Sequence, residues 1–124
     1  MSLFMGAGRS RADRRPFSLH LSFQESVMWI RLGTFLVKPD ALGELRTVYY
    51  RDCVPIVKAA TGNVDCYLME NSDEGGRCAV CTIWETERDA KQYEASGSAM
   101  QVVEMVRKFF ASPPLLESFL VSRP

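Results

Sequence analysis

Cys78-x-x-Cys81 is the residue pair in this chain whose spacing comes closest to that of a metal site. Cysteines at this spacing supply half of a structural zinc site when a second pair completes the tetrahedron. The other two cysteines, Cys53 and Cys66, are not spaced as a second pair. Along a strand, moreover, a three-residue offset directs two side chains to opposite faces. We therefore predict that the cysteines are packing residues and that the protein holds no metal.

His20 is the only histidine, so a Ser-His-Asp triad or a histidine-based metal site could be built only around it. It lies on the polar side of an alternating segment near the N-terminus, which favours a surface role. Gly6-Ala7-Gly8 lies in the same region and does not follow a strand, so it does not read as a phosphate-binding loop. We expect no bound cofactor.

Aromatic side chains are the remaining candidates for a functional site. Buried tyrosine and tryptophan side chains need partners for their polar atoms. Two interpretations are open: the rings fill the core, as aromatic stripes usually do, or they line a pocket for a flat organic ligand. The set consists of Trp29, Tyr49, Tyr50, Tyr67, Trp84 and Tyr93, with Met69 among them.

The aromatic residues must be positioned by strands and helices, and the hydrophobic periodicity predicts these elements in the order β-α-β-β-α-β. Pro39 and Asp40 mark the start of a helix that Pro55 kinks or breaks late. Thr86 begins a capping box for a further helical region, which Ser96-Gly97-Ser98 divides. The expected strands span 27–37, 64–70, 78–84 and 115–121, and the expected helices span 40–60, 86–95 and 99–110. This order predicts an α+β ferredoxin-like fold, with a four-stranded antiparallel sheet and helices on one face.

Residues 1–26 differ from the domain expected at 27–124. Residues 1–16 are rich in Gly, Ser and Arg without periodicity, which is typical of a leader, a tag remnant or sequence upstream of a true start at Met28. Over 17–23, apolar and polar residues alternate strictly, and this period of two predicts an extra N-terminal strand. Its apolar residues are Phe17, Leu19, Leu21 and Phe23.

Charge and composition exclude several classes of partner. Fifteen basic and fifteen acidic residues cancel, so no global field attracts nucleic acid or an anionic membrane. No apolar window is long enough to span a bilayer. Four cysteines without an apolar signal stretch favour a reducing, cytoplasmic setting over a disulfide framework. We predict a cytoplasmic protein that binds neither nucleic acid nor membrane.

The segment Cys78–Trp84 predicts a protein partner. An antiparallel sheet with helices on one face should show polar residues at every second position of a strand. In this strand, both the odd-numbered and the even-numbered positions are nearly all apolar. Two helical segments cannot cover both faces of a sheet. The face that the helices leave uncovered must then pack on another sheet, most simply the sheet of a second copy of the chain. We predict a homodimer that forms through this sheet face.

Three stretches of the sequence resemble the antibiotic biosynthesis monooxygenase-like family of the dimeric α+β barrel superfamily. They are Arg31–Asp40, Thr82–Ala90 and Tyr93–Ser96, and the resemblance extends over residues 28–121. The family includes cofactor-independent oxygenases of polycyclic phenols, in which the substrate itself, as an electron-rich enolate, reduces oxygen. The resemblance therefore implies a dimeric α+β barrel and a chemistry that needs no metal. Trp84 matches a tryptophan common at the end of the third strand and is expected to line a pocket.

The same family includes haem-degrading enzymes. These carry an asparagine, a tryptophan and a histidine at positions that resemble Leu32, Tyr93 and Val103 in this sequence. None of the three residue types is kept here. Since the side chain of Val103 cannot ligate iron, the resemblance does not extend to haem degradation.

We therefore expect a cofactor-independent monooxygenase that acts on an aromatic or quinone-like small molecule in a pocket within one subunit. The alternative is a non-catalytic dimeric domain that binds a small ligand or serves as an interaction module, because no general base stands out. A proton acceptor could come from the tyrosines or from a carboxylate such as Glu85. The residues expected to line the pocket are Trp84, Tyr93, Tyr67, Tyr50 and Arg31, the last of these assisting an anion.

Overall fold

The computed structural model describes residues 27–122. The elements in this part of the chain are strand β1 (Val27–Leu36), helix α2 (Leu42–Val48), the π-helical turn η1 (Tyr49–Cys53), helix α3 (Val54–Lys58), strands β2 (Asn63–Glu70) and β3 (Arg77–Trp84), helices α4 (Glu87–Ala95) and α5 (Ser98–Val106), the 3₁₀ turn η2 (Arg107–Phe109) and strand β4 (Leu115–Ser122). The predicted α+β ferredoxin-like fold is confirmed. The strand predicted over 17–23 lies outside the described residues and stays a prediction.

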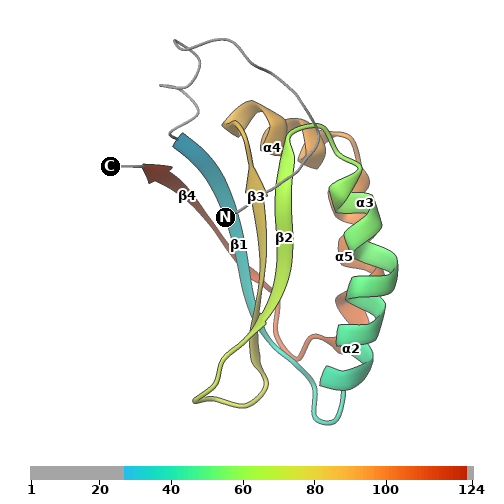
Figure 1. The fold of residues 1–124 in the computed structure, drawn as a ribbon. Coiled ribbons are helices and arrows are strands. Elements are labelled where there is room, and N and C mark those ends of the chain that lie inside the picture. Colours follow the sequence, from blue (N-terminus) through green and yellow to red (C-terminus); the bar gives the residue numbers. More distant parts are fainter. Residues whose placement is uncertain (1–26, 123–124) are drawn as a thin grey trace.

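The four strands pair antiparallel in the order β2-β3-β1-β4. Trp29 of β1 lies opposite Trp84 of β3 on one side and opposite Leu120 of β4 on the other. Because side chains alternate along a strand, every second residue of β1 and β3 shares the face on which Phe35 packs against the helices. Helices α2, α3 and α5 lie along this face, and no described helix covers the opposite one (Figure 1).

The chain leaves β1 through a tight turn at Lys38–Ala41, in which the Ala41 amide donates to the Lys38 carbonyl over 3.1 Å. Asp40 follows Pro39 and has a φ of 63°, the left-handed conformation that the third position of a type II turn requires. Asp40 is therefore a turn residue. The helix begins two residues later than predicted, at Leu42, and Ala41 precedes it without a side-chain cap.

Pro55 lies in the first turn of α3, shortly after η1. Proline has no N–H to donate, and its ring clashes with the preceding helical turn. The wider π turn Tyr49–Cys53 absorbs this mismatch, so the helical path continues from Leu42 to Lys58. The irregularity that Pro55 predicts is thus a π turn, which also buries Tyr49 and Cys53.

The start of α4 shows the predicted cap. The Thr86 hydroxyl accepts a hydrogen bond from the Asp89 amide over 3.0 Å, which satisfies one of the free amides of the first turn. Gly62 lies just before β2, after helix α3, and has a φ of 82°. A Cβ at this position would collide with the Asp89 side chain. Gly62 therefore permits both the turn into β2 and the close approach of α4.

The core between sheet and helices consists of two adjoining clusters. One surrounds Phe35 and Leu45, and the other surrounds Cys66 and Trp84. Full burial of a large apolar side chain contributes roughly 1.5–3 kcal/mol, so these clusters hold the helices on the sheet. All four cysteines are free and buried. No helix within residues 27–122 is long and apolar enough to cross a membrane.

Candidate functional site

A mostly apolar cavity of about 400 Å³ lies between the helix-covered face of the sheet and the helices. This volume falls in the range of small-molecule sites, which span roughly 300–1,000 Å³. Strands β1 and β3 and helix α5 form most of its wall, and Leu116 of β4, which is 66% exposed, borders it. Its lining includes Arg31, Gly33, Tyr49, Val80, Thr82, Trp84, Tyr93, Glu94, Ala99, Met100, Val103 and Leu116.

Gly33 accounts for part of this space. It lies in the interior of β1, opposite Val80 of β3 and Leu116 of β4. A Cβ at this position would lie 3.1 Å from Cδ2 of Leu116, so a larger side chain would occupy the cavity. A glycine inside a strand often marks a place where a ligand or another backbone comes close. The missing side chain at Gly33 therefore leaves room for a ligand above the sheet.

Trp84 and Tyr93 line the cavity together. Their rings lie 5.0 Å apart between centroids, at an angle of 35°. Trp84 is 0% exposed, and its indole nitrogen donates to the Thr82 hydroxyl over 3.0 Å, so its orientation is held from within β3. The two predicted residues thus form one aromatic wall, against which a flat ligand can stack.

The tyrosine hydroxyls at the cavity are protonated at neutral pH. Burial raises the pKa of Tyr93 to about 12. Burial also raises the pKa of Tyr49, and the nearby Cys66 thiol adds to this effect. The Tyr49 hydroxyl has no oxygen or nitrogen partner within residues 27–122. Both groups can therefore donate a hydrogen bond, but neither is a ready base.

Arg31 brings a positive charge to the cavity. Its Nη2 forms an ion pair with Oε2 of Glu94 in α4 over 2.6 Å, and its Nη1 donates to the hydroxyl of Ser118 in β4 over 3.0 Å. Both charged residues border the cavity, and their side chains are 28% and 36% exposed. The pair therefore ties β1 to α4 and β4 at a solvent-accessible part of the cavity wall.

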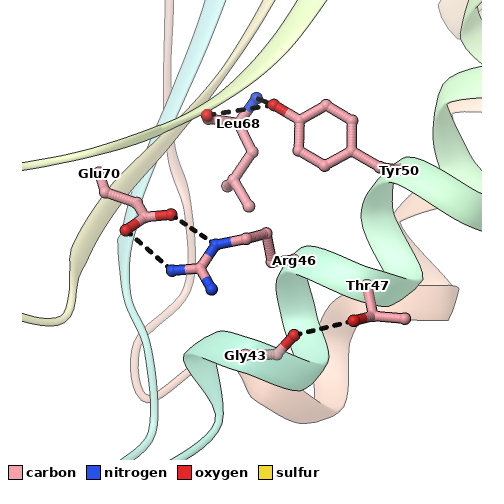
Figure 2. A network of polar contacts seen from close by, with 6 residues as sticks. All are labelled: Gly43, Arg46, Thr47, Tyr50, Leu68 and Glu70. Carbon is pink, nitrogen blue, oxygen red and sulfur yellow. Dashed lines mark hydrogen bonds and ion pairs between the residues drawn. The ribbon is translucent and has the colours of Figure 1, made fainter.

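Tyr50 and Tyr67 do not line this cavity. The Tyr50 hydroxyl accepts from the Leu68 amide over 3.1 Å, beside the ion pair between Arg46 and Glu70 (Figure 2). Tyr67 lies in register with Cys81, on the face without helices, and its hydroxyl donates to Oδ2 of Asp65 over 2.6 Å. That hydrogen bond raises the pKa of Tyr67 to about 12. Of the five predicted pocket residues, the structure brings together Trp84, Tyr93 and Arg31.

Gly33 and Glu94 border the cavity but were not among the residues expected there from the sequence. Gly33 had a usable signal, since a glycine interrupts an otherwise β-rich run. Glu94 had none, because its proximity to Arg31 depends on how α4 packs against β1. Glu85, a base candidate from the sequence, does not border the cavity.

A second, more polar groove of about 610 Å³ lies between α3 and α4. Pro55, Ala59, Asp89 and Gln92 line it, and Tyr93 borders both spaces. Asp89 already bonds the start of its own helix through its backbone. The apolar cavity carries the aromatic pair and the ion pair, and is therefore the better candidate for a binding site.

The described residues at the cavity lack the donor set of the haem-degrading enzymes. Leu32, Tyr93 and Val103, the positions that resemble those of haem-degrading enzymes, all border the cavity. Valine and leucine side chains have no atom that can ligate iron. Within residues 27–122, no three His, Cys, Asp or Glu side chains gather in a way that could hold a metal ion.

Comparison with known proteins agrees with this fold. The chain is similar to a protein of Bordetella bronchiseptica described as a candidate antibiotic biosynthesis monooxygenase, with a TM-score of 0.67, 19% identity and coverage of 74% of this chain and 94% of that one. It is similar to a conserved protein of Methanosarcina mazei Go1, with a TM-score of 0.68, 12% identity and coverage of 83% and 99%. It is also similar to SnoaB, a cofactor-independent oxygenase from Streptomyces nogalater, with a TM-score of 0.59, 15% identity and coverage of 75% and 89%.

At these identities the structural likeness shows the fold alone. No curated protein matches the sequence. Residues 28–107, which include the cavity residues of β1, β3, α4 and α5, match the family described as antibiotic biosynthesis monooxygenase. Proteins of this family are typically dimeric. The chain belongs to the antibiotic biosynthesis monooxygenase family.

Proposed function

We propose that the protein is a cofactor-independent oxygenase that binds a flat aromatic or quinone-forming molecule in the cavity beside Trp84. The observation that carries this proposal is the mostly apolar cavity of about 400 Å³ that the Trp84–Tyr93 pair and Gly33 line, a volume in the range of small-molecule sites. Family membership supports a monooxygenase at family level, and the fold shared with SnoaB fits a cofactor-independent type.

The proposed reaction takes its electrons from the substrate. An anthrone loses a proton to give an enolate, and the enolate carbon reduces O₂. One oxygen atom becomes the new carbonyl of the quinone, and the other leaves as water with the two hydrogens lost from that carbon. The protein then has to orient the ring, exclude bulk water and stabilise the enolate oxygen. The protonated hydroxyl of Tyr93, which borders the cavity, is a suitable hydrogen-bond donor.

Proton removal has one candidate at the cavity. Glu94 is the only carboxylate among the described residues that border it, and Arg31 already engages it. Because no histidine is among the described residues that border the cavity, we expect the rate to rise with pH as more of the substrate ionises to the enolate. A bell-shaped profile centred near pH 6.5, the ordinary pKa of histidine, would contradict this expectation.

The test is oxygen uptake and quinone formation with anthrone, comparing Gly33→Leu with Gly43→Leu. Gly33→Leu places a side chain in the cavity, and the neighbouring Leu116 end is exposed and able to shift. Gly43 lies on α2, and a Cβ there meets nothing within 4 Å. We expect turnover by the parent protein, a loss of about tenfold or more in Gly33→Leu, and little change in Gly43→Leu. Equal activity of the two variants would contradict the assignment of the cavity.

A binding protein without catalysis is the second candidate, because the cavity tyrosines are held protonated and the one carboxylate is paired. The same experiment separates the two functions. Quenching of tryptophan fluorescence by a quinone, without any turnover of anthrone, would favour binding alone. Quinone formation that exceeds the uncatalysed rate would exclude it.

We also propose that the chain forms a homodimer through the sheet face that no described helix covers. Tyr67, Met69 and Phe119 lie on this face by register and are between 41% and 47% exposed. These residues lie on β2 and β4, the two edge strands of the sheet, and large apolar side chains exposed on one face are typical of an interaction site. A second copy of the same sheet offers a matching surface, and dimers are typical of the family.

A further inference from the structure

Arg31 is the only basic side chain among the described residues that border the cavity. An arginine beside an apolar space needs a partner for its charge, which Glu94 supplies, and the Ser118 hydroxyl accepts a further hydrogen bond from it. The two contacts involve Nη2 and Nη1, whereas a guanidinium has five N–H donors. Arg31 can therefore bind a further acceptor that enters the cavity.

Glu94 is an unfavourably placed partner. It lies in the last turn of α4, where the structure has no basic residue, and the exposed carbonyl ends of a helix repel a carboxylate. Its side chain is also 36% exposed, so it can rotate into solvent at little cost. A second carboxylate arriving from the cavity side can take its place on Arg31 without breaking the Ser118 contact.

We propose that the ligand of the cavity carries a carboxylate, and that Arg31 binds it in place of Glu94. This inference rests on the proposed function and names its substrate class as a flat aromatic acid. Arg31 and Gly33 lie two residues apart on the same face of β1, which corresponds to roughly 7 Å along the strand. A ring above Gly33 therefore places a substituent on its edge within reach of the guanidinium, whose planar fork matches a carboxylate.

The test uses two quinones of equal shape and different charge: anthraquinone-2-carboxylate and anthraquinone-2-carboxamide. Their dissociation constants are measured by quenching of tryptophan fluorescence and by calorimetry, at a fixed low ionic strength. We expect the carboxylate to bind the parent protein about tenfold more tightly than the amide, as charged hydrogen bonds do.

Three variants identify the group responsible. Arg31→Gln should remove the preference for the carboxylate, so that acid and amide bind with similar affinity, and the remaining amide binding shows that the cavity still folds. Glu94→Gln should strengthen carboxylate binding several-fold, because the competing charge is gone. Arg46→Gln is the matched control: it removes an arginine from another ion pair, with Glu70, away from the cavity, and should change neither affinity.

Each other outcome counts against the proposal. Equal binding of acid and amide would overturn it and leave the cavity as a binding site. A carboxylate preference that survives Arg31→Gln, or weaker carboxylate binding in Glu94→Gln, would overturn it as well. Failure of both quinones to bind the parent protein would overturn the proposed function together with this inference.

Discussion

Neighbouring residues of β3 face two different environments. Thr82 and Trp84 lie on the helix-covered face and border the cavity, whereas Cys81 and Ile83 lie on the face that no described helix covers. Both faces are largely apolar. Helices cover one face, although Leu116 and Leu120 of β4 remain 66% and 61% exposed on that side. On the other face, Phe119 and Met69 are 47% and 41% exposed.

This difference shows how one strand can serve two purposes. Successive side chains of a strand point to opposite faces of the sheet. In β3, a substitution at an even-numbered position therefore changes the cavity, and one at an odd-numbered position changes the face that no described helix covers, called the open face below. The account therefore predicts that ligand binding and dimer formation respond to different residues of the same element.

The largest expected effect is on assembly. Phe119→Lys places a charge on the open face, and we expect a dimer to become a monomer, because burying an unpaired charge in an interface costs several kcal/mol. Light scattering over a range of protein concentrations measures it. Leu120→Lys is the control, since Leu120 is the next residue of β4, points to the other face and is 61% exposed. Dissociation by both variants alike, or a monomeric parent protein, would contradict the account.

A smaller effect is expected at high pH, on the cavity side. The pKa of Tyr93 is raised by burial to about 12, while that of an unfolded tyrosine is about 10. Because the folded state holds the proton more tightly, its stability is intact below pH 10 and falls as pH rises toward 12. Allowing for partial exposure, the loss is about 1–2 kcal/mol.

Chemical denaturation at several pH values measures this loss, and Tyr93→Phe should reduce it. The pKa of Tyr67 is also raised to about 12, but the main cause there is its hydrogen bond to Asp65. Tyr67→Phe is therefore the comparison on the open face. If Tyr93→Phe leaves the alkaline loss unchanged, burial of this residue in the cavity wall is disproved.

The smallest expected effect concerns the helix that carries Tyr93 and Glu94. Thr86→Ala removes the hydroxyl that caps α4, and should lower the free energy of unfolding by about 1 kcal/mol. Thr47→Ala is the control, because the Thr47 hydroxyl donates to the Gly43 carbonyl within its own helix, a contact that does not favour the helix. A larger loss in Thr47→Ala than in Thr86→Ala would be the opposite of what the cap predicts.

Most of the fold was predictable from local patterns. The caps and stops at Thr86, Gly62 and Gly97 have direct chemical signals, and the structure has an α4 cap at Thr86 and positive φ angles at both glycines. The role of Asp40 was harder to predict, because the residue types that favour a helix cap and those that favour a type II turn overlap. The π turn before Pro55 depends on how the helix accommodates a missing N–H, which the sequence signals only as an irregularity.

The site was predictable only in part, for a geometric reason. Trp84, Tyr93 and Arg31 meet because α4 crosses the end of β1 and β3, and the aromatic residue types alone did not separate them from Tyr50 and Tyr67. Tyr67 was misleading because strand parity, rather than residue type, decides which face it occupies. The partnership of Arg31 with Glu94 is likewise a product of tertiary packing.

The most direct test of the account is a crystal structure of the protein with anthraquinone-2-carboxylate. The account predicts the quinone within one protomer, its ring against Trp84 and above Gly33, on the sheet face that the helices cover. A quinone bound on the open sheet face, or in the groove between α3 and α4 with the cavity left empty, would contradict it.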